Sequence, residues 1–339
     1  MKPSEVSTIL KYAIKEKLNV LIKGKPGIGK TDLVKQAAKA AEADLIISHP
    51  VVSDPVDYKG MPAIIETATG EKIAVFLPFG DLKKIVDADG LTIFFMDDLG
   101  QAPPAVQAAA MQLLLARRIN EHKVSDHVCF MAATNNKTDK AGVSGILEPV
   151  KSRFASIIAL DVDLEDWITW AINSKRIPTE LIAFMRFRPN LLDDFHPTAD
   201  LTNSSCPRTV EHVAKWMNAG IPKSYEFEVF SGAAGEGFAA EIISFLQIFR
   251  SLPNPVTILM DPEGPAAIIP EEPSAKYAIC GAIAARASEQ NMKNVVKYAN
   301  RMPEEFSVLM LRDCINNAPD TANTDAFIEW ASLHKDVLI

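Results

Sequence analysis

One short run of residues has the types and spacing needed to hold phosphate groups. The run GKPGIGKT fits the pattern GxxxxGK[ST]. Glycines let the backbone wrap closely and point N–H groups at phosphate oxygens, while Lys30 would reach the β and γ phosphates and Thr31 would ligate Mg²⁺. The alternative is a glycine-rich turn without a ligand. We predict a nucleotide-binding loop that comprises Gly24, Lys25, Pro26, Gly27, Ile28, Gly29, Lys30, Thr31 and Asp32.

Two adjacent carboxylates follow a second apolar run, in the sequence FFMDDLG. Enzymes with a phosphate-binding loop place a magnesium-binding carboxylate at the end of a buried strand that follows the loop in the sequence. Asp97 would hold Mg²⁺ through water, and Asp98 would act as the general base that polarises an attacking water. The alternative for both residues is a solvated turn at the end of the strand.

An amide pair, Asn135 and Asn136, follows a third apolar run. If the strands are parallel, this pair lies at the same sheet edge as Asp97. An amide there can hold the attacking water or sense the γ phosphate without adding charge. An ordinary turn explains an Asn pair equally simply, so both interpretations stay open at this point.

The elements that would position these residues form an alternating pattern. Short apolar runs at 19–23, 44–48, 91–96, 128–134 and 156–160 predict strands, and the clearest helical patterns between them are 30–41 and 103–118. Strands that are apolar on both faces and alternate with helices imply a parallel sheet covered on both sides. The first part of the chain is therefore predicted to be one α/β domain.

After residue 160 the strand signal nearly vanishes, and helical patterns predominate. Helices are predicted at 164–173, 179–185, 207–218, 235–250, 275–287, 293–302, 304–316 and 324–334. The proline-rich segment 252–274 is the best candidate for a linker. The predicted fold class is a P-loop α/β domain at 1–160, followed by an all-helical lid at 161–252 and a helical C-terminal extension at 253–339.

Composition narrows the function classes. The chain has 339 residues, 48% of them hydrophobic, and a net charge of -8, which argues against a broad surface for nucleic acid or an anionic membrane. Its four cysteines stand singly and predict reduced, mostly buried thiols rather than a metal site. No run of 18 apolar residues occurs. We expect a cytoplasmic protein without a membrane partner.

The order of several blocks resembles one family. GKPGIGKT, FFMDDLGQAPPAVQAAAMQLLLARR, AATNNKTDKAGV, LEPVKSRF and SSCPRTVEHVAKW follow one another as they do in the AAA+ ATPases of the MoxR group. The chain is most similar to the branch with DEINRAPP, AAxNRxxDRAGV and xNRF blocks. Later runs such as DLEDWITWA and YANRMPEEF extend the resemblance over nearly the whole chain.

The resemblance implies roles for single residues. Gly24, Gly29, Lys30 and Thr31 match the Walker A block, and Asp97 with Asp98 matches Walker B. Asn135 matches the sensor 1 asparagine, with Asn136 as the fallback. Arg153 matches the arginine finger that acts in a neighbouring subunit's site, and Arg208 matches the sensor 2 arginine of the lid. The alternatives are a surface cation for Arg153 and a helix-start residue for Arg208.

The resemblance also implies cofactors and partners. It implies ATP and Mg²⁺, and a ring of identical subunits, normally a hexamer, because the arginine finger acts in trans. Hydrolysis in such a ring would remodel or help to mature a client complex, commonly beside a protein with a von Willebrand factor A domain.

One departure from the family keeps a second interpretation open. Relatives have Asp-Glu where this chain has Asp97-Asp98, and Asn-Arg where it has Gly100-Gln101. A carboxylate that is one methylene shorter sits about 1.5 Å back along the chain, and a misplacement of about 1 Å can cost on the order of a hundredfold in rate. The chain could therefore be a scaffold or switch that binds ATP and hardly hydrolyses it. A DNA-directed AAA+ protein is a third possibility, which the net charge disfavours.

Overall fold

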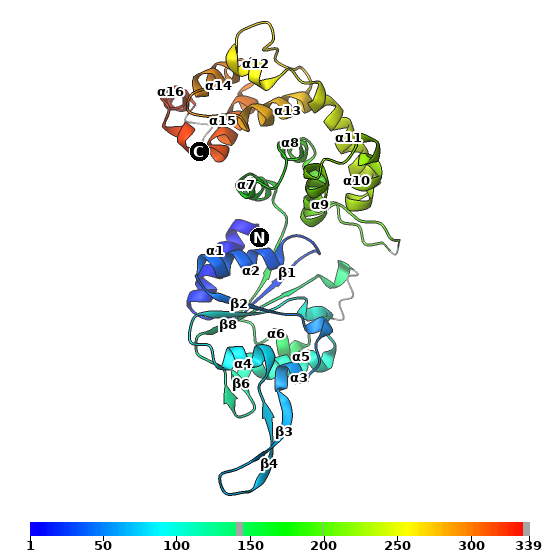
Figure 1. Cartoon of the computed structure of the whole chain (residues 1–339), viewed down its shortest axis with the longest axis vertical. Helices are drawn as coiled ribbons and strands as arrows, with labels where there is room; N and C mark the ends of the chain where they lie inside the picture. The colour runs from blue at the N-terminus through cyan, green and yellow to red at the C-terminus, as the bar shows by residue number, and fades with distance from the viewer. Residues whose placement is uncertain (140–144, 199, 335–339) are drawn as a thin grey trace. The chain divides into compact units, whose positions relative to one another are not determined.

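The structure is a computed structural model that describes residues 1–139, 145–198 and 200–334. The block KAGV at 140–143, which contributes to the family resemblance, lies outside these residues. The chain divides into two compact units, Met1–Val162 and Asp163–Ile339. Figure 1 shows a mixed α/β structure in the first unit and a helical structure in the second. Each unit is described by itself.

The first unit is built on a five-stranded parallel sheet, so the predicted fold class is confirmed. Its strands are β1 (Val20–Lys23), β2 (Asp44–Ser48), β5 (Thr92–Met96), β8 (Val128–Thr134) and β9 (Ser156–Ala159). Their order is β2-β5-β8-β1-β9, and every neighbouring pair is parallel. The segments that leave β1, β5 and β8 therefore meet at one edge of the sheet.

Apolar side chains on both faces of this sheet explain the two layers of helices. On one face, Val20 and Ile22 pack with residues of α1 (Pro3–Lys15) and α2 (Lys30–Ala40). On the other, Leu21 and Phe94 pack with residues of α3 (Val56–Lys59), α4 (Gly80–Val86), α5 (Pro104–Ala116) and α6 (Glu148–Lys151). Helix α1 is absent from the predictions, whereas α2 and α5 match them closely. The sheet is thus covered on both sides, as Figure 1 shows.

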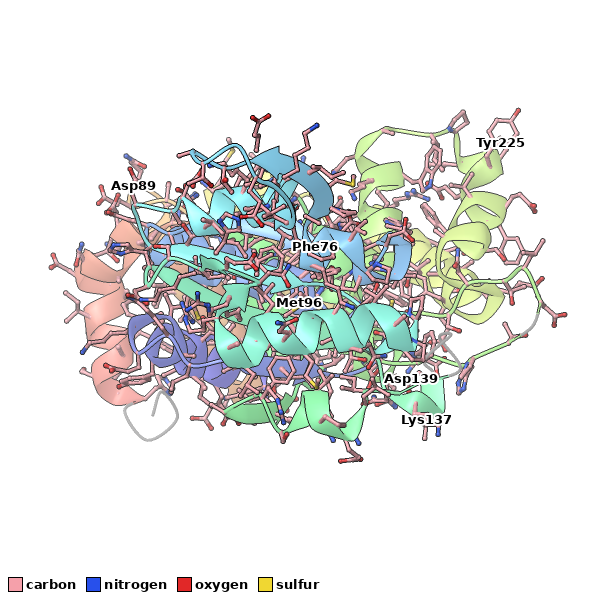
Figure 2. The ribbon with its side chains drawn as sticks, turned by 90° about the horizontal axis from the view of Figure 1, so that it is seen from below. Phe76, Asp89, Met96, Lys137, Asp139 and Tyr225 are labelled. Carbon is pink, nitrogen blue, oxygen red and sulfur yellow. The ribbon has the colours of Figure 1, made fainter. Side chains whose placement is uncertain are left out.

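Two antiparallel hairpins are also absent from the predictions. Strands β3 (Met61–Glu66) and β4 (Lys72–Leu77) form the longer hairpin, which extends away from the sheet (Figure 1). Strands β6 (Arg118–Ile119) and β7 (His122–Lys123) form the shorter one, directly after α5. Phe76 on β4, labelled in Figure 2, is one of several large apolar side chains that the longer hairpin leaves exposed.

The second unit is predominantly helical. Its helices are α7 (Leu164–Ser174), α8 (Thr179–Phe187), α9 (Pro207–Asn218), α10 (Glu226–Ala234), α11 (Glu236–Ser251), α12 (Pro255–Met260), α13 (Pro273–Ala284), α14 (Met292–Ala299), α15 (Glu304–Asn317) and α16 (Asp325–Leu333). The predicted linker contains α12, and α8 of the predicted lid packs against α13 of the predicted extension. The division of the chain into three domains stays a prediction.

Candidate functional site

The predicted phosphate loop lies between β1 and α2, where close backbone packing requires glycine. The Gly24 N–H donates to Thr134 O at 3.2 Å, which ties the loop to the end of β8. A Cβ at Gly24 would stand 2.7 Å from Leu160 O, closer than real Cβ atoms come to a backbone oxygen. Gly29 has a φ of +95° and caps the N-terminus of α2. The first turn of α2, with its exposed N–H groups, is thus presented at the sheet edge.

Lys30 is folded back into this loop and is almost fully buried. Its Nζ donates to Gly24 O at 3.0 Å, to Lys25 O at 2.8 Å and to Asn135 Oδ1 at 2.6 Å. An ammonium group held by neutral oxygens can exchange them for phosphate oxygens, which are stronger acceptors because they are charged. Lys30 and Asn135 are 105 positions apart in the sequence, so only the parallel sheet brings them together.

Thr31 and Asp97 form the second contact of the site. The Thr31 hydroxyl donates to Asp97 Oδ2 at 2.7 Å, and Asp97 is 9% exposed. Asp97 follows Met96, the last residue of β5, which Figure 2 labels. The Asp97 N–H donates to Ser48 O at 2.9 Å, which continues the pairing of β5 with β2. A hydroxyl and a carboxylate are oxygen ligands of the kind that Mg²⁺ takes together with substrate phosphates.

The end of β2 is fixed in turn by a buried tyrosine. Ser48 Oγ and the Tyr58 hydroxyl of α3 lie 2.6 Å apart. Burial raises the pKa of Tyr58 above its usual value of 10.0, despite the opposing effect of the hydrogen bond to Ser48. Tyr58 therefore stays neutral and supports the end of β2, where Ser48 O accepts the hydrogen bond from Asp97.

Asp98 is held by two amide side chains. Its backbone is left-handed, with φ 57° and ψ 35°, an uncommon conformation for a residue other than glycine. Its Oδ1 accepts hydrogen bonds from Gln101 Nε2 at 2.9 Å and from Asn135 Nδ2 at 3.4 Å. Asn135 is thus the bridge between Lys30 and Asp98. The sequence analysis did not assign Gln101 to the site, and only its spacing of three residues from Asp98 could have suggested the contact.

Asn136 has a different environment from Asn135. Its N–H donates to Asp139 Oδ2 at 3.1 Å, at the start of the short 3-10 helix η3 (Lys137–Asp139). Figure 2 labels Lys137 and Asp139 of this turn. The two amides thus differ in their surroundings, because Asn135 contacts Lys30 and Asp98 whereas Asn136 initiates a turn.

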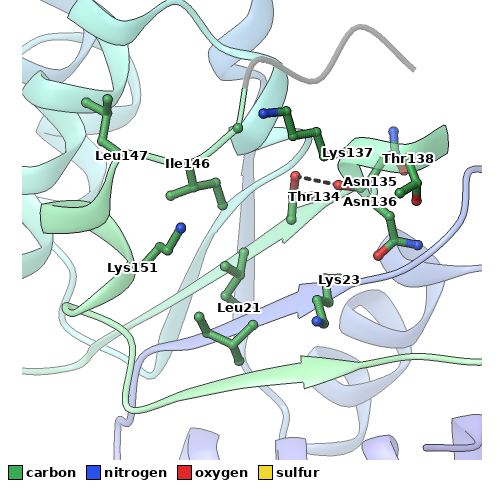
Figure 3. Close-up of a pocket in the computed structure, with 12 residues that line it drawn as sticks. Leu21, Lys23, Thr134, Asn135, Asn136, Lys137, Thr138, Ile146, Leu147 and Lys151 are labelled. Carbon is green, nitrogen blue, oxygen red and sulfur yellow. Dashed lines mark hydrogen bonds between the residues drawn. The ribbon is translucent and has the colours of Figure 1, made fainter. Parts of the chain in front are cut away.

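A pocket of about 640 Å³ borders the site at Asn135 (Figure 3). Apolar side chains such as Leu21 and Ile146 line it together with the lysines Lys23, Lys137 and Lys151. These lining residues come from β1, β8, β9 and the segments after β8, rather than from residues 24–31. Asn135 is therefore shared between the pocket and the contact network around Lys30.

The predicted arginine Arg153 lies apart from this network within the first unit, and Arg208 belongs to the second unit. Arg153 precedes β9, and its carbonyl oxygen accepts from Asn19 Nδ2 at 3.1 Å, next to the start of β1. Because β1 and β9 are parallel with Val20 opposite Ser156, Arg153 stands at the amino edge of the sheet, whereas residues 24–31 stand at the carboxyl edge. Arg208 belongs to the second unit, where it is an exposed residue of α9. The roles assigned to both arginines stay predictions.

The remaining predicted loop residues have supporting positions. Ile28 is buried among the apolar residues beneath α2, whereas Lys25 and Pro26 are half-buried and Gly27 is buried with a φ of 76°. Asp32 is exposed and lies 3.7 Å from Lys35. Among the described residues there is no group of three or more His, Cys, Asp or Glu side chains that could hold a metal by itself. A metal ion here would take its further oxygen ligands from water or from a bound substrate.

One comparison with known proteins found a family that matches part of this sequence. Residues 20–162 match the family described as ATPase family associated with various cellular activities (AAA). This range runs from the first residue of β1 to just beyond β9 and contains every contact around Lys30 and Asp98 described above. These residues are therefore similar to an AAA domain, whereas this match does not include the rest of the chain. A search of curated proteins found no match.

The chain also has solved structures to which it is similar at low sequence identity. A RuvB mutant of Thermotoga maritima is 13% identical with a TM-score of 0.38, and the match covers 91% of this chain and 80% of that chain. NtrX from Brucella abortus is 11% identical with a TM-score of 0.41, covering 92% and 67%. A putative ATPase from Cytophaga hutchinsonii is 16% identical with a TM-score of 0.33, covering 91% and 79%. Among the described residues, no helix is both long and apolar enough to span a membrane.

Proposed function

We propose that the chain is an AAA+ ATPase that hydrolyses ATP with Mg²⁺ and, as a ring, uses this reaction to remodel or help mature a partner complex. The observation that carries the proposal is the contact chain from Lys30 through Asn135 to Asp98, beside the Thr31–Asp97 pair. A cation for phosphate, two oxygen ligands for a metal and a carboxylate for a water molecule thus gather at one sheet edge. These are the groups that phosphoryl transfer to water requires.

Each side chain has a distinct task in this proposal. Lys30 exchanges Gly24 O and Asn135 Oδ1 for phosphate oxygens, and the loop N–H groups bind the remaining charge. Thr31 and Asp97 would hold Mg²⁺, which would neutralise charge on the phosphates when it is bound. The residues present fit that ion, because both supply oxygen and they already lie within hydrogen-bond distance of each other.

Asp98 and Asn135 act on the water. The oxygen of the water attacks the γ phosphorus while Asp98 accepts a proton from that water. The bond between the γ phosphorus and the leaving ADP oxygen breaks. Asn135, released from Lys30 when the phosphates arrive, orients the same water through its amide. Because neither residue carries positive charge, the cations for the developing phosphoryl charge must come from Lys30, Mg²⁺ and an arginine.

The position of Arg153 supports action in a neighbouring subunit. Arg153 stands at the sheet edge opposite to residues 24–31, so its own unit directs it away from its own loop. An arginine that serves a second copy produces a closed ring when each subunit contacts the next in the same way. We therefore propose a homo-oligomeric ring of six subunits, with Arg208 as the sensor 2 residue. The family resemblance adds a von Willebrand factor A domain protein as a candidate partner.

A second candidate function, an ATP-dependent switch with little hydrolysis, is favoured by the environment of Asp98. This acid is shorter than glutamate, and one of its oxygens already accepts two amide hydrogen bonds. A carboxylate that is short and occupied is a poor acceptor for a proton from water. In this case ATP binding would order the ring, and hydrolysis would only reset it.

Substitutions at Asp98 test the proposed function. Because Asn cannot take the proton, we expect Asp98→Asn to lower the rate of phosphate release by on the order of a hundredfold while ATP affinity is retained. If Asp98→Asn releases phosphate as fast as wild type, Asp98 is not the base. Asp98→Glu separates the two candidates, because a large gain in rate would mean that the native site is tuned to be slow.

A further inference from the structure

Asp98 is restrained by a side chain that does not take part in phosphate binding. Gln101 Nε2 donates to Asp98 Oδ1 at 2.9 Å, and the Gln101 N–H donates to Asp98 O at 3.0 Å. Both bonds close the same short turn, the 3-10 helix η2 (Leu99–Gln101), which follows the left-handed residue Asp98. The acid and the glutamine are therefore fixed to each other by both main chain and side chain.

Packing around this turn keeps Gln101 in place. Leu99 and Ala102, on either side, are fully buried. Gly100 lies so close to β8 that a Cβ there would stand 2.1 Å from Thr134 Oγ1. The turn can therefore shift little without displacing the end of β8. In addition, Gln101 Oε1 is buried and makes no hydrogen bond with the described residues.

That buried oxygen indicates which way the Gln101 amide must face. If the amide were reversed, Oε1 would point at the carboxylate of Asp98, and two acceptors would repel each other. The present orientation leaves Oε1 without a partner, which is unfavourable for a buried acceptor. The contact with Asp98 is therefore the interaction that determines the orientation of this side chain.

The two amides on Asp98 differ in their link to nucleotide. Asn135 contacts both Asp98 and Lys30, so phosphate that attracts Lys30 also alters Asn135. Gln101 contacts Asp98 through the η2 turn, and its described hydrogen bonds include none to residues 24–31. ATP binding can therefore release the Asn135 contact and leave the Gln101 contact intact.

We propose that Gln101 is a positioning residue that restrains Asp98 and slows ATP hydrolysis. The proton of the attacking water needs a lone pair on the carboxylate, and the N–H of Gln101 occupies one on Oδ1. To act as a base, Asp98 must give up this bond or turn its other oxygen to the water. Gln101 thus keeps hydrolysis slower than Asp98 alone would allow. This inference rests on the proposed ATPase function.

Gln101→Met tests the restraint, because methionine has nearly the same length but no N–H group. We expect the maximal rate of phosphate release to rise about fivefold, because this is the effect of losing one hydrogen bond to the base. The KM for ATP and the thermal midpoint should change little. Gln112→Met is the matched control, because Gln112 is an exposed glutamine on α5, and it should leave the rate unchanged.

Repeating the Gln101→Met substitution in the Asp98→Asn variant distinguishes a positioning role of Gln101 from a merely structural one. In Asp98→Asn, Gln101→Met should have no effect on the rate, because the residue on which Gln101 acts has been removed. If Gln101→Met releases phosphate at the wild-type rate or more slowly, or accelerates it equally in both backgrounds, the restraint is refuted while the ATPase stands. If no variant exceeds Lys30→Ala, the proposed function fails, and the inference fails with it.

Discussion

Lys30, Asn135 and Asp98 form one continuous chain of contacts, and two kinds of sequence signal predicted its members. The motif GxxxxGK[ST] predicted Lys30, and the ends of two apolar runs predicted Asp98 and Asn135. Gln101 could not be predicted, because its contact depends on the left-handed backbone of Asp98 and the close packing of Gly100 on Thr134. Sequence spacing identifies the residues of this site but not the restraint among them.

Gly24 gives the most local prediction. A Cβ at this position would overlap Ile28 Cδ1 and Leu160 O, at 2.6 Å and 2.7 Å, and the second is backbone that cannot rotate away. We expect Gly24→Ala to lower the free energy of unfolding by about 1–3 kcal/mol and to weaken ATP binding.

Denaturant unfolding of Gly24→Ala beside Gly90→Ala measures the effect. Gly90 is the matched control, because a Cβ there would meet no heavy atom within 4 Å. Equal stability of the two variants would mean that the loop can move away from Leu160.

At the scale of elements, burial decided what could be predicted. Strands β5 and β8 were found because they are buried along their full length and form uninterrupted apolar runs. The hairpin of β3 and β4 was missed, although residues 73–77 form an apolar run; most residues of both strands are exposed, and the hairpin lies outside the five-stranded sheet. Helix α1 is a different case, since its buried Val6, Leu10, Ala13 and Ile14 already have the spacing of a helix in the sequence.

In the helical unit, a buried ion pair joins α8 and α15. Arg186 on α8 and Asp313 on α15 pair through two hydrogen bonds, and their side chains are 5% and 3% exposed. Asp313→Asn would leave the arginine charged and buried without its partner. We expect the free energy of unfolding to fall by about 3–5 kcal/mol.

An exposed pair between neighbouring helices is the control for Asp313→Asn. Arg312 Nη2 on α15 and Glu165 Oε2 on α7 lie 2.8 Å apart, and the two side chains are 46% and 57% exposed. Because water screens this pair, Arg312→Gln should cost less than about 1 kcal/mol. Similar losses in urea unfolding for the two variants would mean that burial does not determine the importance of the Arg186–Asp313 pair.

At the scale of the whole molecule, the proposed ring depends on where Arg153 lies. The sequence marks Arg153 only through its resemblance to a family block, whereas the parallel register of β1 and β9 puts it at the sheet edge opposite to residues 24–31. Sequence reasoning could not derive this separation, because it follows from the pairing of strands 136 positions apart, as in Val20 with Ser156.

Mixing two inactive variants tests action between subunits. Lys30→Ala removes the cation that would bind the phosphates, and Arg153→Ala removes the proposed arginine finger. Each variant alone should therefore be nearly inactive. In a randomly mixed ring, about a quarter of the sites would combine an intact Lys30 with a neighbour's intact Arg153. We expect phosphate release by the mixture to approach that fraction of the wild-type rate. A mixture no more active than its components would exclude the trans role of Arg153.

Steady-state phosphate release at saturating ATP and Mg²⁺ measures directly whether the loop around Lys30 hydrolyses ATP. Lys30→Ala removes the cation that contacts Asn135 in the site and that would bind the phosphates. We predict measurable release by wild type and a rate on the order of a hundredfold lower for Lys30→Ala, as for the loss of other preorganised donors. Equal release by the two proteins, with or without a candidate partner, would contradict the account.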